Sequence, residues 1–174
     1  MVERIKVSKH FHLDEFVDPF TYFTENDRGI SKIDNSLFKI ADLMREKLGK
    51  PLRINNWWAF YAANSEKSNE WLIKKIEASY YSKWSGFRSI KCRIGAKLSA
   101  HKLGRAIDPK GDEEAMFKIV KDNIKEFYNL GLRRLEDPSI TKGWLHMDIH
   151  TLNVQPNTIR VVDLKKCTQT LKVA

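Results

Sequence analysis

Two short segments, far apart in the chain, carry side chains that could bind a metal ion. Residues 99–108 have the sequence SAHKLGRAID, and residues 144–148 have the sequence WLHMD. Neutral imidazole and carboxylate are ordinary ligands of Zn²⁺, and a catalytic zinc site has three protein ligands and a fourth position open to water. The sequence therefore predicts a zinc site whose ligands are His101, Asp108 and His146.

The spacing of the first two ligands requires a bend between them. His101 and Asp108 are seven residues apart, which is farther than one helical turn. A turn at Gly104 would carry the chain into a short strand, 105–108, that ends at Pro109. We expect this strand to hold the second ligand rigidly.

The third ligand lies in a segment with the alternation of a β-strand. Successive side chains of a strand point to opposite faces. His146 and Asp148 would therefore share one face, and Leu145 and Met147 would share the other. This arrangement would place two polar groups beside the metal and two apolar groups toward a core.

At these positions the chain resembles the zinc D-alanyl-D-alanine carboxypeptidases and the related peptidoglycan L,D-endopeptidases of the hedgehog/DD-peptidase superfamily. Their pattern is Ser-x-His-x-x-Gly-x-Ala-x-Asp followed by Trp-x-His-x-Asp. The chain matches this pattern at every fixed position, namely Ser99, His101, Gly104, Ala106, Asp108, Trp144, His146 and Asp148. Upstream, residues 85–89 (SGFRS) resemble the family's Ser-Gly-Tyr-Arg-Ser loop, and residues 10–16 (HFHLDEF) resemble its N-terminal segment.

The resemblance implies a fold, a cofactor and a reaction. It predicts an α+β fold in which helices pack on one face of a small, mainly antiparallel sheet. It also predicts a Zn²⁺-dependent peptidase that hydrolyses peptide bonds in bacterial peptidoglycan, as a D,D-carboxypeptidase or as an endopeptidase. The loop arginine of the family helps to hold the substrate, which assigns that role to Arg88. Ser99 is a second candidate contact, although its hydroxyl could instead close a turn with its own backbone.

The chain is most similar to the compact members of the family that phages and prophages encode. The partners implied are peptidoglycan and, for a virion protein, other virion proteins. The first residues, MVERIK, lack the apolar core of a signal peptide, and no apolar run approaches the ~20 residues of a membrane-spanning helix. We therefore expect the protein in the host cytoplasm before lysis or in the virion, acting at the cell wall.

One position departs from the family pattern. Many members carry an acidic general base three residues before the last zinc histidine, and here that residue is Gly143. Glu136, in the predicted strand before this segment, is our first candidate for the catalytic base. Asp148 is the second, although it could instead orient a metal ligand from behind. If neither serves, the protein would be a catalytically impaired, zinc-containing virion or wall-binding structural protein.

Plainer interpretations exist for the same residues. His101, Asp108 and His146 could be unrelated hydrogen-bonded polar groups, and Arg88 could be a surface arginine. The formal net charge of +9 is also compatible with nucleic-acid binding. However, the basic residues are spread along the chain without a nucleic-acid motif, and bacterial walls are anionic too. We expect the basic stretch 83–105 to attract the wall polymer toward the site.

Tryptophan and cysteine are less informative. Trp57, Trp58 and Trp84 could line a substrate groove, but burial in the core is the commoner fate of tryptophan. Cys92 and Cys167 are the only cysteines and form no C-x-x-C pair, which argues against a cysteine zinc site. We expect Cys92 to be structural, and a single disulfide stays open as an alternative.

Length and hydrophobic periodicity predict the elements that position the site. With 174 residues and no composition break, we expect one domain, 1–174, in which 59–84 is an insertion relative to the family and 151–174 is a C-terminal extension. Helices are predicted at 35–48, 70–81 and 113–128. Strands are predicted at 52–57, 105–108, 132–136, 144–150 and 159–164, the last at an edge of the sheet.

Overall fold

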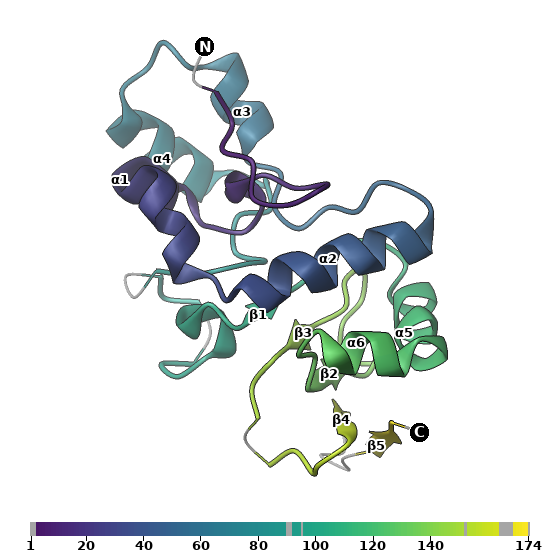
Figure 1. Cartoon of the computed structure of the whole chain (residues 1–174). Helices are drawn as coiled ribbons and strands as arrows, with labels where there is room; N and C mark the ends of the chain where they lie inside the picture. Colours follow the sequence, from purple (N-terminus) through teal and green to yellow (C-terminus); the bar gives the residue numbers. More distant parts are fainter. Residues whose placement is uncertain (1–2, 90–91, 95, 152, 164–168, 174) are drawn as a thin grey trace.

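The computed structural model describes residues 3–89, 92–94, 96–151, 153–163 and 169–173 (Figure 1). These residues form a mixed structure of helices and one five-stranded sheet, which confirms the α+β class. The α-helices are α1 (Pro19–Glu25), α2 (Asn35–Leu48), α3 (Trp58–Ala63), α4 (Asn69–Ala78), α5 (Glu113–Asp122) and α6 (Ile124–Asn129). Three 3₁₀-helices are η1 (Leu13–Glu15), η2 (Asn26–Lys32) and η3 (Ala100–Leu103). The strands are β1 (Ala106–Ile107), β2 (Arg134–Glu136), β3 (Met147–Asp148), β4 (Thr158–Val162) and β5 (Gln169–Lys172).

Helix α2 forms over the residues that the periodicity predicts. Asp34 caps its N-terminus by accepting a hydrogen bond from the Ser36 backbone N–H over 3.0 Å. Gly49 ends the helix in the left-handed conformation, with φ 66°. The buried face carries Leu37, Phe38, Ile40, Ala41 and Met44. The predicted helix 35–48 is thereby confirmed.

The sheet has the order β1-β3-β2-β4-β5 and is mainly antiparallel, as expected. β3 pairs antiparallel with both β1 and β2, β5 pairs antiparallel with β4, and only β2 and β4 are parallel. Leu135 of β2 lies opposite Met147 of β3, and both side chains are fully buried. Because β3 is paired on both of its edges, its side chains are held in fixed positions.

The helices form two groups. α5 and α6 lie beside the sheet, α2 crosses the middle of the molecule, and α1, α3 and α4 gather at the end away from β4 and β5 (Figure 1). The predicted insertion, 59–84, supplies α4 and most of α3, and α4 packs against α1. In the described part of the chain, no helix has the length and apolar character needed to cross a membrane.

The predicted helix 113–128 is interrupted, so the prediction of one continuous helix is wrong. α5 ends and α6 begins on either side of Asn123, whose backbone leaves the helical region (φ −123°, ψ 32°). The Asn123 side chain donates a hydrogen bond to the carbonyl oxygen of Ile119 over 2.8 Å. Asparagine side chains compete in this way with the helical hydrogen bonds of the backbone, and a helix can end there.

The predicted strand 52–57 is also wrong. Its only sheet-like contact among the described residues is an isolated bridge between Arg53 and Lys110. The next two backbone N–H groups bond to different segments. Asn55 donates to the carbonyl oxygen of Glu15, and Asn56 donates to the carbonyl oxygen of Ser82. A strand needs one partner along its length. The apolar composition of this segment reflects burial and not pairing.

Two strands of the sheet, β4 and β5, lie in residues 151–174, the segment predicted to be a C-terminal extension. The predicted strand 159–164 corresponds to β4, except that residue 164 lies outside the described residues. β4 lies between β2 and β5, so the prediction of an edge position is wrong. The unpredicted strand β5 covers β4 and takes the edge.

Glu15 is expected to make the stability of the protein depend on pH. Burial raises the pKa of its carboxyl to about 7, although the His12 backbone N–H donates to that carboxylate over 3.0 Å. Because this folded-state pKa lies above the unfolded value, the stabilising contribution is complete below about pH 4.5 and is lost as the pH rises through 7. Relative to the wild type, Glu15→Gln should therefore gain on the order of 2–3 kcal/mol in unfolding free energy between pH 4.5 and pH 8.

Urea unfolding of wild type and Glu15→Gln at both pH values measures this difference. Glutamine keeps the acceptor for the His12 N–H but cannot ionise. A constant difference between the two proteins across the pH range would show that Glu15 does not titrate near neutrality.

Candidate metal centre

The first ligand is positioned by a 3₁₀-helix and a glycine turn. His101 lies in η3, and Gly104 ends this helix with φ 66°, in the region that favours glycine. A Cβ at Gly104 would collide with the backbone carbonyl oxygen of Lys32, so no larger residue fits. The chain then enters β1, which leads to Asp108. The predicted bend between the two ligands is confirmed.

The third ligand, His146, immediately precedes β3. Leu145 and Met147 are fully buried in the core, whereas His146 and Asp148 line a cavity on the other side. The predicted alternation is therefore confirmed. Antiparallel pairing of β1 with β3 brings Asp108 beside His146.

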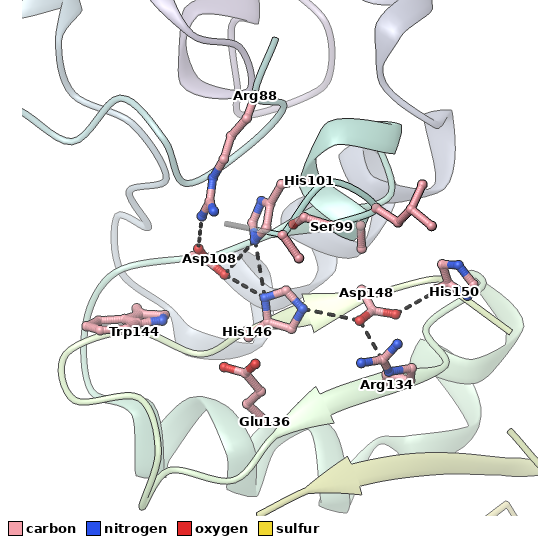
Figure 2. Close-up of a pocket in the computed structure, with 13 residues that line it drawn as sticks. Arg88, Ser99, His101, Asp108, Arg134, Glu136, Trp144, His146, Asp148 and His150 are labelled. Carbon is pink, nitrogen blue, oxygen red and sulfur yellow. Dashed lines mark hydrogen bonds and ion pairs between the residues drawn. The ribbon is translucent and has the colours of Figure 1, made fainter. Parts of the chain in front are cut away.

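Three potential ligand atoms converge at the wall of this cavity (Figure 2). Asp108 Oδ1 lies 2.8 Å from His146 Nδ1 and 3.3 Å from His101 Nε2, and the two nitrogens are 3.3 Å apart. Metal–ligand distances of about 2.0–2.1 Å in tetrahedral geometry separate ligand atoms by roughly 3.3 Å. Two of the three separations match this value, the third is a hydrogen-bond distance of 2.8 Å, and the three atoms together could hold one metal ion.

The hydrogen bonds behind both rings turn their lone pairs toward the same point. His101 Nδ1 donates to the carbonyl oxygen of Gly86 over 2.8 Å, because a carbonyl can only accept. His146 Nε2 donates to the carboxylate Oδ2 of Asp148 over 3.2 Å. In each neutral ring the inner nitrogen then carries a lone pair that faces Asp108 Oδ1. Three lone pairs directed at one another repel, so the arrangement favours a cation between them.

Hydrogen bonds within the site shift the pKa values of both His146 and Asp108. Burial opposes a charge on His146, but hydrogen bonds to Asp108 and Asp148 outweigh burial and raise the pKa of His146 to about 10. Burial alone would raise the pKa of Asp108, but hydrogen bonds from His101 and His146 hold that pKa well below its usual range. A metal ion held by these residues would have to displace a proton from His146.

Arg88 reaches the ligands from the loop that precedes η3. Its Nη2 donates to Asp108 Oδ2 over 3.2 Å, and its Nε donates to the carbonyl oxygen of Trp84 over 2.5 Å. The Asp108 carboxylate is therefore held with one oxygen toward Arg88 and the other toward the imidazoles. Arg88 also lines the cavity, where its remaining N–H groups can meet a substrate.

Glu136 lies on the wall of the same cavity, which has a volume of about 430 Å³ (Figure 2). Its backbone N–H donates to the carbonyl oxygen of His146 over 3.2 Å, so the two side chains stand on neighbouring strands. In the described part of the chain, the Glu136 carboxylate has neither a hydrogen bond nor an ion pair.

Asp148, by contrast, is fully buried and uses both of its oxygens. Oδ2 accepts from His146 Nε2 and lies 3.5 Å from Arg134 Nε, and Oδ1 accepts from the His150 backbone N–H over 2.9 Å. A carboxylate with these contacts fixes the ring orientation of His146 and the nitrogen that carries the proton. This geometry favours the orienting role of Asp148 over that of a base.

Asp148→Asn should weaken zinc binding by about 10- to 100-fold, because the His146 ring loses the carboxylate that orients it. Competition with a chromophoric chelator measures the affinity. Asp137→Asn, at the end of β2 and outside the cavity, is the matched control and should bind zinc as the wild type does. Equal affinities in all three proteins would rule out the orienting role.

Ser99 and three residues without a predicted catalytic or binding role also line the cavity. Ser99 precedes η3, but its side chain makes no capping hydrogen bond, so its hydroxyl is not needed by the turn. Arg134, Trp144 and His150 also line the cavity. Strand alternation could have identified Arg134, because it lies two residues before Glu136 on the same strand.

Trp57, Trp58 and Trp84, the three candidates for lining a substrate groove, lie in different parts of the fold. Trp57 is fully buried and donates to the carbonyl oxygen of Val17 over 3.2 Å, so of the two alternatives for this residue the structure shows burial in the core. Trp58 packs against Tyr61, with ring centroids 4.5 Å apart, and does not line the cavity. Trp84 lines a second cavity that adjoins the first.

Neither Gly143 nor Cys92 lines the cavity. Gly143 adopts φ 81°, and its N–H donates to Glu113 Oε2 over 3.0 Å, so the usual position of the family's base is occupied by a turn. Cys92 is buried with a free thiol, which agrees with a structural role. Cys167 lies outside the described residues.

Comparisons with protein-family models, with curated proteins and with solved structures find no match. The geometry supports one conclusion directly: His101, Asp108 and His146 form a group that could hold a metal ion at the wall of an open cavity.

Proposed function

We propose that this protein is a zinc-dependent peptidase that hydrolyses peptide bonds in bacterial peptidoglycan. The observation that carries the proposal is the convergence of His101 Nε2, Asp108 Oδ1 and His146 Nδ1 at the wall of a cavity. Two imidazoles and one carboxylate are a ligand set that suits zinc, and three protein ligands leave a position for chemistry. The motif resemblance to the hedgehog/DD-peptidase superfamily supports the choice of substrate and of fold family.

The chain's own residues would divide the catalytic work. When bound, zinc would polarise the scissile carbonyl and lower the pKa of water at its open position. Glu136, whose carboxylate is unpaired among the described residues, would take a proton from the attacking water and return it to the leaving amine. Asp148 would keep His146 in its ligating orientation.

Two further residues would hold the peptide. Arg88 has N–H groups left after its bonds to Asp108 and Trp84, and a guanidinium suits a substrate carboxylate. Ser99 offers a hydroxyl on the wall of the same cavity. Both groups border the metal ligands, so a peptide held by them would lie across the reactive position.

The wider setting follows from the same resemblance. The compact, phage-like motif arrangement supports an endolysin or a virion-associated enzyme that acts at the bacterial wall. The net charge of +9 would favour approach to an anionic wall polymer. The competing proposal is a zinc-containing structural protein of the virion or wall, which Gly143 favours because it provides no acid.

Digestion of purified sacculi tests the proposal. Protein loaded with one zinc ion should release soluble peptides or free amines, and chelation should stop the release. Mass spectrometry of the products identifies the bond that is cut. Bound zinc without release from any sacculus type would favour the structural protein, and failure to bind zinc would remove the basis of both proposals.

A further inference from the structure

A second cavity adjoins the candidate metal centre. It has a volume of about 230 Å³ and shares Arg88, Asp108 and Trp144 with the first cavity. Its remaining lining residues are Tyr81, Ser82, Lys83, Trp84, Ser85 and Lys110. A molecule that reaches the metal ligands can therefore extend into this second cavity without leaving the protein surface.

The charges of the second cavity are strongly unbalanced. Lys83, Arg88 and Lys110 contribute three cationic side chains, and Asp108 is the only carboxylate in the lining. The two oxygens of Asp108 are already directed at Arg88 and at the imidazoles. No free anion therefore remains among the lining residues to balance the lysines.

The two lysines differ in how they are bound. The ammonium of Lys83 donates to the carbonyl oxygen of Ser79 over 2.5 Å, which holds it at the end of α4. The ammonium of Lys110 lies 4.6 Å from the ring centre of Trp144. In the described part of the chain, it has no hydrogen bond and no ion pair. Lys110 is thus a partly buried cation without an anionic partner.

The backbone holds Lys110 in this position. An antiparallel bridge joins Lys110 to Trp144, and a second bridge joins it to Arg53. The Lys110 N–H donates to the carbonyl oxygen of Arg53 over 2.6 Å. Because Lys110 also follows Asp108 by only two residues, the cation and the metal ligand are fixed to the same short segment. The fold therefore sets the distance along the backbone between Lys110 and the metal ligand Asp108.

We propose that Lys110, together with Lys83 and the face of Trp144, forms a subsite for a carboxylate of the substrate in the second cavity, next to the cavity that Glu136 lines. The inference rests on the zinc site of the proposed function, and it names the substrate class: a peptide that carries an acidic group close to the cleaved bond. The ammonium of Lys110 would attract an anion, and the cation–π contact with the Trp144 ring would keep the ammonium in place.

A series of simple carboxylates tests the subsite without relying on catalysis. Acetate, malonate, succinate, glutarate and adipate are titrated calorimetrically into zinc-loaded protein. One carboxylate group can bind the metal, and only a dicarboxylate of suitable length can also reach Lys110. We expect one member of the series to bind wild type roughly tenfold or more tightly than acetate does.

Three variants make the result specific. Lys110→Met, which removes the charge at similar volume, should abolish the preference for the dicarboxylate, and Lys110→Arg should restore much of it. Lys102→Met is the matched control, because Lys102 lies in η3 but lines neither cavity, and it should keep the preference. The zinc content of each variant must remain one per chain, which shows that the fold and the ligands are intact.

The experiments distinguish the carboxylate subsite from the peptidase activity. Equal dicarboxylate preference in wild type and Lys110→Met would overturn the subsite, even if the protein digests sacculi. A preference that depends on Lys110 would support the subsite, even if no sacculus is digested and the peptidase proposal falls.

Discussion

Replacing Glu136 with glutamine should lower peptide hydrolysis by about 10²- to 10⁴-fold while one zinc ion stays bound per chain. Glutamine has nearly the same shape but cannot accept a proton from water. Because Glu136 contributes no ligand atom to the group of His101, Asp108 and His146, the metal should be unaffected. The loss should fall on kcat, since the proton is transferred in the chemical step.

Single-turnover rates and zinc content of wild type and Glu136→Gln measure this effect. Asp137→Asn is the matched control: it removes a neighbouring carboxylate that does not line the cavity, and it should keep full activity. If Glu136→Gln stays active while Asp148→Asn loses activity with its zinc still bound, Asp148 is the base and our assignment is wrong. The structure argues against that outcome, because both Asp148 oxygens already accept hydrogen bonds.

The second large effect is expected from His101→Ala. A structural zinc site with four ligands contributes about 10–16 kcal/mol, so the loss of one ligand should cost about 3–4 kcal/mol, or roughly 10²- to 10³-fold in zinc affinity. Hydrolysis should fall with the metal content. His101 is also nearly buried, so its removal leaves the Gly86 carbonyl oxygen without its donor.

Zinc content after gel filtration, with peptide release from sacculi, measures the effect of His101→Ala. His10→Ala is the control, because His10 lies outside the cavity, and it should keep both the zinc and the activity. Far-ultraviolet circular dichroism of each variant checks the fold. One tightly bound zinc ion in His101→Ala would contradict the ligand set, whatever the activity.

Helix α2 shows which features of the fold could be predicted from local sequence. Its apolar stripe, its capping aspartate and its terminal glycine lie within one segment, so their effects do not depend on distant residues. The break at Asn123 and the absence of a strand at 52–57 depend on which partner the backbone finds. Periodicity cannot resolve that choice, because buried segments of different structure have the same apolar composition.

The interior position of β4 illustrates the same limit for the sheet. A strand becomes an edge strand only if no other segment pairs with it, and β5 pairs with it here. Its residues Gln169–Lys172 are half-exposed or exposed and carry little apolar signal. Their strand conformation comes from pairing with β4, so it could be found only in the folded chain.

For the candidate site, the sequence by itself determined the ligand types, the bend at Gly104 and the alternation of residues 145–148. These features follow from short spacing and from the chemistry of each side chain. Only the tertiary structure decided which atoms face one another, because that depends on the pairing of β1 and β2 with β3. Both oxygens of Asp148 accept hydrogen bonds, whereas among the described residues the carboxylate of Glu136 is unpaired and Lys110 lies in a cavity without a counterion. Contacts between residues far apart in the chain are set by packing, and packing is a property of the whole fold.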